Sequence, residues 1–210
     1  MSEIKNIIFD LGGVLLDIDY NKATAAFKRL GFADFEKMYS QYTADKLFEK
    51  LETGHINETS FYQAMIKTHS DISSSDIMES WNAMLLDFRL SSIEFLKRLR
   101  PKFRLFLLSN TNIIHQAAFN KLFIEQTGFH SLNDFFEIAW YSNEIGLRKP
   151  TMEIYQFILQ DAAIKAEETF FIDDSYNNIE TAKQLNFKTH LLVPGERIED
   201  LDYNGYFISS

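Results

Sequence analysis

The sequence predicts an α/β fold, in which a Rossmann-like, doubly wound parallel sheet forms a core that is interrupted by an inserted α-helical cap domain. Two observations favour this architecture. Short apolar runs alternate with helical patterns in the second half of the chain, and a series of helical patterns separates the first apolar run from the others. We therefore expect residues 1–16 and 91–210 to form the core and residues 17–90 to form the cap.

The core strands are predicted from short apolar runs that are bounded by turn residues. Five runs qualify as strands: residues 4–9, 105–108, 136–140, 169–172 and 189–193. Helical patterns lie between them near residues 112–127, 151–162 and 177–185. A further helix is expected from Ser91, since Ser91 and Glu94 have the spacing of a capping box. Strands that alternate with helices indicate a parallel sheet.

Helical spacing extends through the cap segment. Tyr20, Ala23 and Phe27 follow it, and so does a later series: Ile77, Trp81, Met84, Leu85 and Phe88. Asn57 is placed to cap one helix, and residues 73–76 offer a polar start for another. We predict four or five short helices without strands. Because the segment leaves after the first strand and returns before the second, it should act as a lid beside the carboxyl end of the sheet.

The composition disfavours several classes of protein. A net charge of -9 with only 21 scattered Lys and Arg disfavours binding to nucleic acid. Without cysteine, disulfides, thiolate metal sites and a cysteine nucleophile are not available. The chain contains no apolar stretch of about 18 residues and does not start like a signal peptide. We expect no membrane partner and a cytoplasmic location, and the sequence leaves the oligomeric state unknown.

Four segments place polar side chains where active-site residues are expected. Asp10, Ser109 and the pair Asp173–Asp174 each follow an apolar strand, and Lys149 precedes a proline in a loop. In an open parallel sheet, ligands bind outside the carboxyl ends of the strands. These side chains therefore predict one phosphate-and-metal site.

Asp10 is the candidate nucleophile. An aspartate after a strand is often only a turn residue, but Gly12 and Gly13 follow it and permit backbone to approach a bound anion closely. A carboxylate that attacks phosphorus forms an aspartyl phosphate and divides the hydrolysis into two easier steps. Ser109 and Asn110 are candidates for binding the phosphate of the substrate, with an ordinary helix cap as the alternative.

Lys149 is the candidate cation of the site. Most lysines only interact with solvent, but a lysine among three carboxylates would pair with Asp10 and with the transferring phosphoryl group. We therefore assign Lys149 to both catalysis and substrate binding. We expect the neighbouring Arg148 to point to solvent.

Asp173 and Asp174 are the candidate metal site. Two adjacent carboxylates repel each other unless a cation or a proton relieves them, and sites made only of oxygen ligands suit Mg²⁺. Asn178 lies a helical turn further on and is placed to steady this loop by hydrogen bonding, although an asparagine at a helix start is often only structural.

The order and content of these segments resemble the haloacid dehalogenase (HAD) superfamily, and the insert resembles the small helical C1-type cap of that family. Residues 108–112, 146–150 and 171–182 look like those of its bacterial alpha-D-glucose-1-phosphate phosphatases. The resemblance implies Asp10 as nucleophile, Ser109 as phosphate-binding hydroxyl and Lys149 as neutralising cation. It also implies a Mg²⁺ ion held by Asp10, the backbone carbonyl of Gly12 and Asp174. Asp173 and Asn178 would then lie behind the ligands.

One position departs from the family pattern. The family usually has a second aspartate two positions after the nucleophile as general acid and base, and this chain has Gly12 there. A general acid typically contributes about 10²- to 10⁴-fold. An anomeric oxygen leaves more readily than an ordinary alkoxide, so Gly12 is consistent with a sugar phosphate such as a hexose 1-phosphate.

We therefore predict a magnesium-dependent phosphatase for a small phosphorylated metabolite. Two alternatives also explain Gly12. A metal-independent 2-haloacid dehalogenase would keep Asp10, but it gives no reason for an acidic pair at 173–174. A non-catalytic phosphometabolite-binding protein could lose the acid, but it need not keep nucleophile, lysine and metal acids together.

Overall fold

The computed structural model describes residues 3–41, 44–69 and 71–203. Its centre is a five-stranded parallel sheet with the order β5-β4-β1-β6-β7. The strands are β1 (Asn6–Phe9), β4 (Arg104–Ser109), β5 (Ile138–Tyr141), β6 (Thr169–Asp173) and β7 (Lys188–Leu191). The predicted parallel α/β core is confirmed.

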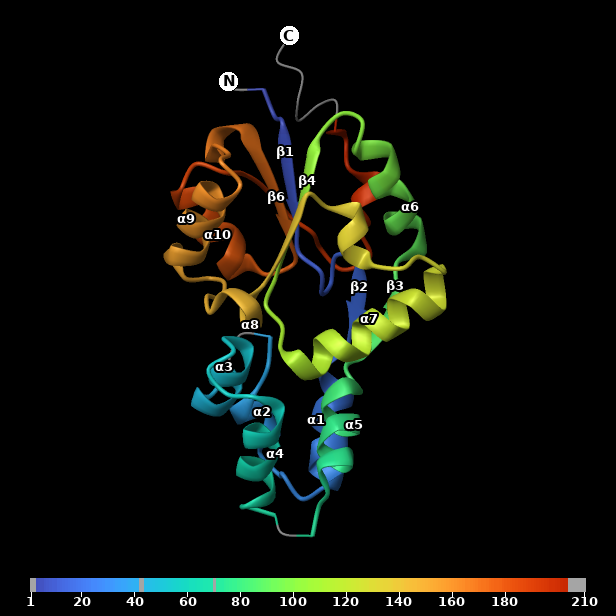
Figure 1. The fold of residues 1–210 in the computed structure, drawn as a ribbon, viewed down its shortest axis with the longest axis vertical. Helices are drawn as coiled ribbons and strands as arrows, with labels where there is room; N and C mark the ends of the chain where they lie inside the picture. The colour runs from blue at the N-terminus through green and yellow to red at the C-terminus, as the bar shows by residue number, and fades with distance from the viewer. Residues whose placement is uncertain (1–2, 42–43, 70, 204–210) are drawn as a thin grey trace.

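Helices cover both faces of this sheet (Figure 1). One side carries α9 (Met152–Asp161) and α10 (Tyr176–Gln184), and the other carries α6 (Leu90–Leu99) and α7 (Ile113–Thr127). The short elements are α8 (Ser142–Ile145) and the 3₁₀ helices η1 (Leu132–Phe135), η2 (Ala166–Glu168) and η3 (Ile198–Asp200). Alternate side chains of β1 enter two separate buried clusters, with Ile7 and Phe9 in one and Ile8 in the other.

The register of the central strands positions the site. Phe9 pairs with Leu107 of β4 on one side and with Ile172 of β6 on the other. The residues that follow these positions therefore emerge at one edge of the sheet. No helix within the described residues is long and apolar enough to cross a membrane.

Within its described residues, the inserted segment carries five helices, which lie at the end of the molecule away from the termini (Figure 1). Their buried side chains form a third hydrophobic cluster together with Ile114 of α7. The helices are α1 (Tyr20–Arg29), α2 (Phe35–Met38), α3 (Lys46–Glu52), α4 (Glu58–Ile66) and α5 (Ser74–Asn82). The predicted caps at Asn57 and Ser73 are present. The buried indole of Trp81 contacts several rings, with centroids 4.9 Å from Phe48 and 6.0 Å from Phe35. Domain boundaries at residues 17 and 90 stay a prediction.

Two details of the predicted insert are wrong. Helix α5 ends at Asn82, and the following β3 (Leu85–Phe88) pairs antiparallel with β2 (Leu16–Ile18). Leu85 and Phe88 lie three residues apart, a spacing that also fits a helix, so periodicity could not detect this long-range pairing.

The predicted capping box at the start of the next helix is also absent. Helix α6 begins at Leu90, and its N-cap residue, Arg89, makes no side-chain cap hydrogen bond. The backbone N–H of Arg89 instead donates to the carbonyl of Leu15, next to the ribbon formed by β2 and β3. This tertiary contact fixes where the helix starts.

Candidate active site

Lys149 is the centre of the site. Its side chain is 1% exposed, and its Nζ lies 2.8 Å from Asp10 Oδ1, 2.7 Å from Asp173 Oδ2 and 2.8 Å from the carbonyl of Leu108. Burial alone would lower the pKa of Lys149, but the two carboxylates outweigh it and raise the pKa above its usual value. The expected pairing of Lys149 with Asp10 is thus present in the structure.

Asp10 lies at the carboxyl end of β1 and lines a pocket between the sheet and the inserted helices. Its Oδ1 accepts hydrogen bonds from the backbone N–H of Leu11 at 2.7 Å and from Lys149. Burial raises the pKa of Asp10 to about 8, because the attraction of Lys149 opposes it only in part. The carboxyl group of Asp10 is therefore fixed in orientation, and in the metal-free protein its burial favours the neutral form.

The two acids at the end of β6 have different surroundings: Asp173 is held by hydrogen bonds, and Asp174 faces the pocket. Asp173 is fully buried and accepts from Lys149, the side chain of Asn178 and the backbone N–H of Ser175. Asp174 lines the pocket, and burial raises its pKa to about 6. The expected role of Asn178 in steadying this loop agrees with its two contacts to Asp173, at 2.9 and 3.0 Å.

Gly13 permits Asp174 to reach its position. Its backbone φ is +69°, and a Cβ at this position would collide with the carboxylate of Asp174. The second glycine after the nucleophile therefore makes room for an acid from another strand end. Asp10, Asp173 and Asp174 each place one carboxylate oxygen within 4.8 Å of the others.

Ser109 and Asn110 lie opposite Asp10 at the end of β4. The hydroxyl of Ser109 makes a long contact of 3.4 Å to the carbonyl of Asn110 and lines the pocket. The amide of Asn110 forms a reciprocal pair with the backbone of Lys149, with two hydrogen bonds of 2.8 Å. Asn110 thereby holds the Lys149 loop, and its predicted contact with substrate stays a prediction.

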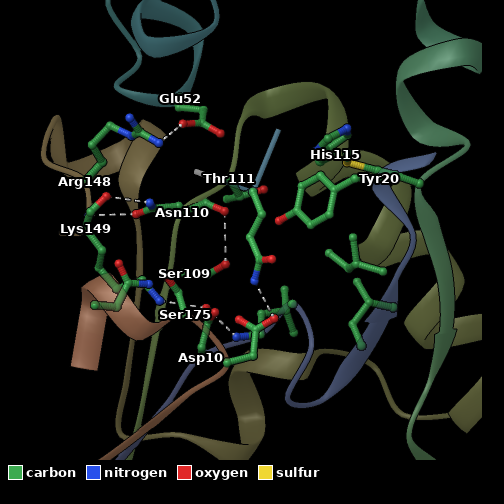
Figure 2. Close-up of a pocket in the computed structure, with 18 of the residues that line it drawn as sticks. Asp10, Tyr20, Glu52, Ser109, Asn110, Thr111, His115, Arg148, Lys149 and Ser175 are labelled. Carbon is green, nitrogen blue, oxygen red and sulfur yellow. Dashed lines mark hydrogen bonds and ion pairs between the residues drawn. The ribbon is translucent and has the colours of Figure 1, made fainter. Parts of the chain in front are cut away.

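Arg148 does not point to solvent as expected. Its Nη2 lies 2.9 Å from Oε2 of Glu52 at the end of α3 (Figure 2). Oε1 of Glu52 accepts from the hydroxyl of Tyr39 at 2.7 Å. Burial raises the pKa of Glu52, although Arg148 and Tyr39 oppose this shift. Three side chains thus join the inserted helices to the loop that carries Lys149.

Sequence analysis missed the wall that the inserted helices contribute to the pocket. Tyr20, Tyr39, Gln41 and Glu52 line it, and Gln41 Nε2 donates to Asp174 Oδ2 at 3.1 Å. One signal was available for Glu52. It lies four residues after Phe48 on the buried side of α3, where a charged residue needs a partner.

His115 has a structural role next to the pocket. It is buried, its Nε2 lies 3.1 Å from the carbonyl of Trp81, and its ring stacks on that indole. Burial lowers the pKa of His115 to about 4, so the imidazole is neutral at pH 7.

Comparison with known proteins agrees with this geometry. The sequence profile of haloacid dehalogenase-like hydrolases matches residues 4–186. D-ribitol-5-phosphate phosphatase of Bacteroides thetaiotaomicron is 32% identical over 188 residues, which are 89% of this chain and 90% of that protein.

Solved structures resemble most of this chain, and two of them illustrate the match. A HAD family enzyme from Bacteroides thetaiotaomicron, an aspartate-to-alanine variant in complex with magnesium and inorganic phosphate, has a TM-score of 0.87 and 33% identity over 98% of this chain and 100% of its own. A predicted HAD-like hydrolase from Porphyromonas gingivalis has a TM-score of 0.83 and 33% identity over 93% and 94%. The resemblance seen in the sequence is confirmed, and the chain belongs to the haloacid dehalogenase-like hydrolase family.

Proposed function

We propose that this chain is a magnesium-dependent phosphatase that hydrolyses a small phosphorylated metabolite through an aspartyl phosphate on Asp10. The observation that carries this proposal is the contact of buried Lys149 with both Asp10 and Asp173 beside a polar pocket. Family membership and the phosphatase and magnesium complexes among similar proteins support the same reaction class.

The acidic cluster fits a magnesium ion, because Mg²⁺ prefers oxygen ligands. Asp173 is already held by a cation and an amide, so it is the least available of the three acids. We therefore assign the ion to Asp10, Asp174 and the backbone carbonyl of Gly12, with Asp173 and Asn178 behind them. When bound, magnesium neutralises charge on the phosphoryl group.

The residues of the chain supply the remaining chemistry. Asp10 attacks phosphorus, the bond to the leaving-group oxygen breaks, and water then releases phosphate from Asp10. Lys149 and the hydroxyl of Ser109 would hold the phosphoryl oxygens. Asn110 keeps Lys149 in place through its backbone.

Two substrate classes are candidates. The absence of an acid at Gly12 favours a hexose 1-phosphate, whose anomeric oxygen needs less protonation than an ordinary alkoxide. The similarity to D-ribitol-5-phosphate phosphatase favours a sugar-alcohol phosphate. Both are small phosphorylated polyols, which is the substrate class that we propose.

Phosphate release from a panel of phosphorylated metabolites, with and without magnesium, tests this function. We expect activity on small sugar and sugar-alcohol phosphates that a chelator stops and magnesium restores. In metal titrations, Asp174→Ala should weaken magnesium binding more than Asp173→Ala. Turnover of 2-haloacids without metal would instead support a dehalogenase, and tight phosphate binding without turnover would support a binding protein.

A further inference from the structure

Position 12 offers no acid in this chain, although it lines the pocket. The backbone of Gly12 is outside the left-handed region, so it would accept a side chain, but a Cβ there would lie only 2.7 Å from Cδ1 of Ile18. The end of the Ile18 side chain, on β2, therefore borders the space next to position 12. A donor to the leaving group has to come from elsewhere in the pocket.

Most other donors in the pocket are already engaged. The hydroxyl of Tyr39 donates to Glu52, and the imidazole of His115 is tied to the carbonyl of Trp81. Lys149 has three acceptors. These groups therefore cannot donate a proton to a leaving group without breaking buried contacts.

The hydroxyl of Tyr20 is not engaged in this way. Tyr20 is the first residue of α1, two positions after Ile18, and the preceding Asp19 anchors it by donating its backbone N–H to the carbonyl of Met84 at 2.9 Å. Figure 2 shows its hydroxyl pointing into the pocket. Among the described residues, no hydrogen bond to this hydroxyl is present. The ring of Tyr20 lies beside that of Tyr39, with 6.2 Å between the two centroids.

The surroundings keep this hydroxyl protonated. Burial raises the pKa of Tyr20 far above its usual value, and the charges of Asp174 and Asp10 raise it further. These carboxylates act on the hydroxyl because it faces the end of the sheet where the phosphoryl group would lie. The site thus contains a neutral O–H donor that has no hydrogen-bond partner among the residues that the structure describes.

We propose that Tyr20 contacts the leaving-group oxygen and provides the proton that position 12 cannot supply. The proposal rests on the proposed phosphatase function. As Asp10 forms its bond to phosphorus, the bond from phosphorus to the leaving oxygen breaks, and that oxygen takes the electron pair and the proton of Tyr20. In the second step, the attacking water returns a proton to the tyrosinate.

This role makes the contribution of Tyr20 depend on the leaving group. Aryl oxides depart without a proton, whereas alkoxides need one. Tyr20 would therefore permit hydrolysis of primary alkyl phosphates even though residue 12 is glycine. A residue that only packs against substrate or closes the pocket would affect both kinds of ester alike.

The test is kcat/KM of wild type and Tyr20→Phe across monophosphates of simple phenols and alcohols, from p-nitrophenyl phosphate to ethyl phosphate. This parameter reports the step in which the alcohol leaves. We expect Tyr20→Phe to lose about 100-fold or more on ethyl phosphate and less than about threefold on p-nitrophenyl phosphate. The matched variant Tyr39→Phe should change both by the same factor.

Each outcome separates the two proposals. A steeper dependence of kcat/KM on the pKa of the leaving group in Tyr20→Phe supports the proton donor. An equal loss of kcat/KM on both esters, or no loss on ethyl phosphate, overturns the role of Tyr20 as proton donor. Turnover of p-nitrophenyl phosphate would still support the phosphatase function in that case. If wild type hydrolyses no phosphomonoester with magnesium, the proposed function itself fails.

Discussion

On the core side of the pocket, Lys149 and Asp173 are each held by three partners, whereas on the cap side Gln41 makes one contact to Asp174 and the hydroxyl of Tyr20 has no hydrogen bond within the described residues. The core side is therefore preorganised for a fixed reaction, which requires charges that do not move as phosphorus is attacked. On the cap side, Arg148 and Tyr39 hold Glu52, but Gln41 and Tyr20 are sparsely bonded and are suited to adapt to different leaving groups. Under the proposed function, reaction class and substrate choice would reside in separate parts of the chain.

The largest expected effect on activity follows from replacing the proposed nucleophile on the core side. Asp10→Asn should reduce phosphate release at least about 10³-fold, as loss of a nucleophile does in other covalent enzymes. Because burial already favours the neutral form of Asp10, the thermal midpoint of the metal-free protein should not fall. Steady-state kinetics and thermal unfolding check both statements, and substantial turnover by the folded variant would contradict the covalent route.

The next effect concerns the cation of the core side. Lys149→Met leaves Asp10 and Asp173 buried without their shared partner, a change that costs about 3–5 kcal/mol in comparable buried pairs. Lys183→Met removes the ion pair that the exposed side chains of Lys183 and Glu180 form, and it should lower the free energy of unfolding by less than about 1 kcal/mol. Urea unfolding measures both free energies. Equal losses would mean that the core side is no more tightly built than the surface.

Two glycine substitutions distinguish an effect on the contact between cap and core from an effect on stability. A Cβ on Gly54 would collide with the carbonyl oxygen of Asn143 in α8, whereas Gly128 has a similar left-handed φ and open space around it. Alanine at either position should cost about 1 kcal/mol in backbone strain. Only Gly54→Ala should also hold the cap away from the core, and we expect it to lower kcat/KM about 10-fold. Equal kinetics in the two variants would contradict this view of the interface.

The smallest effect is a pH dependence of the metal acids. Burial raises the pKa of Asp10 to about 8 and that of Asp174 to about 6 in the metal-free protein. The folded protein therefore binds more protons than the unfolded chain, and it loses them as pH rises through these values. Without metal, the free energy of unfolding should then decline from pH 6 to pH 8. Magnesium replaces the protons, so it should raise the thermal midpoint more at pH 8 than at pH 6.

Unfolding scans at both pH values, with and without magnesium, measure this linkage. Asp10→Asn should flatten the profile of the metal-free protein. A stabilisation by magnesium that is the same at both pH values would contradict the assignment of these carboxylates to the metal.

The core half of the site could be predicted because its signals are local. Asp10 and Asp173 each stand directly after a buried apolar run, so their strand-end positions follow from the sequence alone. The parallel register of β1 and β6 then brings them together. Even Lys149 could be assigned, since a lysine beside several carboxylates has few other roles.

The cap half could not be predicted in the same way. Helical periodicity identifies α3 and α5, but it does not indicate which polar side chain turns toward the pocket. The pairing of β2 with β3 and the contact of Arg148 with Glu52 join residues far apart in the sequence. Such contacts are set by how the insert packs on the core. The spacing of α3 marks Glu52 as a buried charge that needs a partner, but it does not identify that partner.

The most direct test of the account is to identify the group that receives phosphate. Wild-type protein with magnesium and a turned-over sugar phosphate can be quenched in acid, digested and analysed by mass spectrometry. The account predicts a phosphoryl group on the peptide that contains Asp10, which disappears in Asp10→Asn. A phosphoryl group on another peptide, or none during rapid turnover, would contradict the aspartyl-phosphate route.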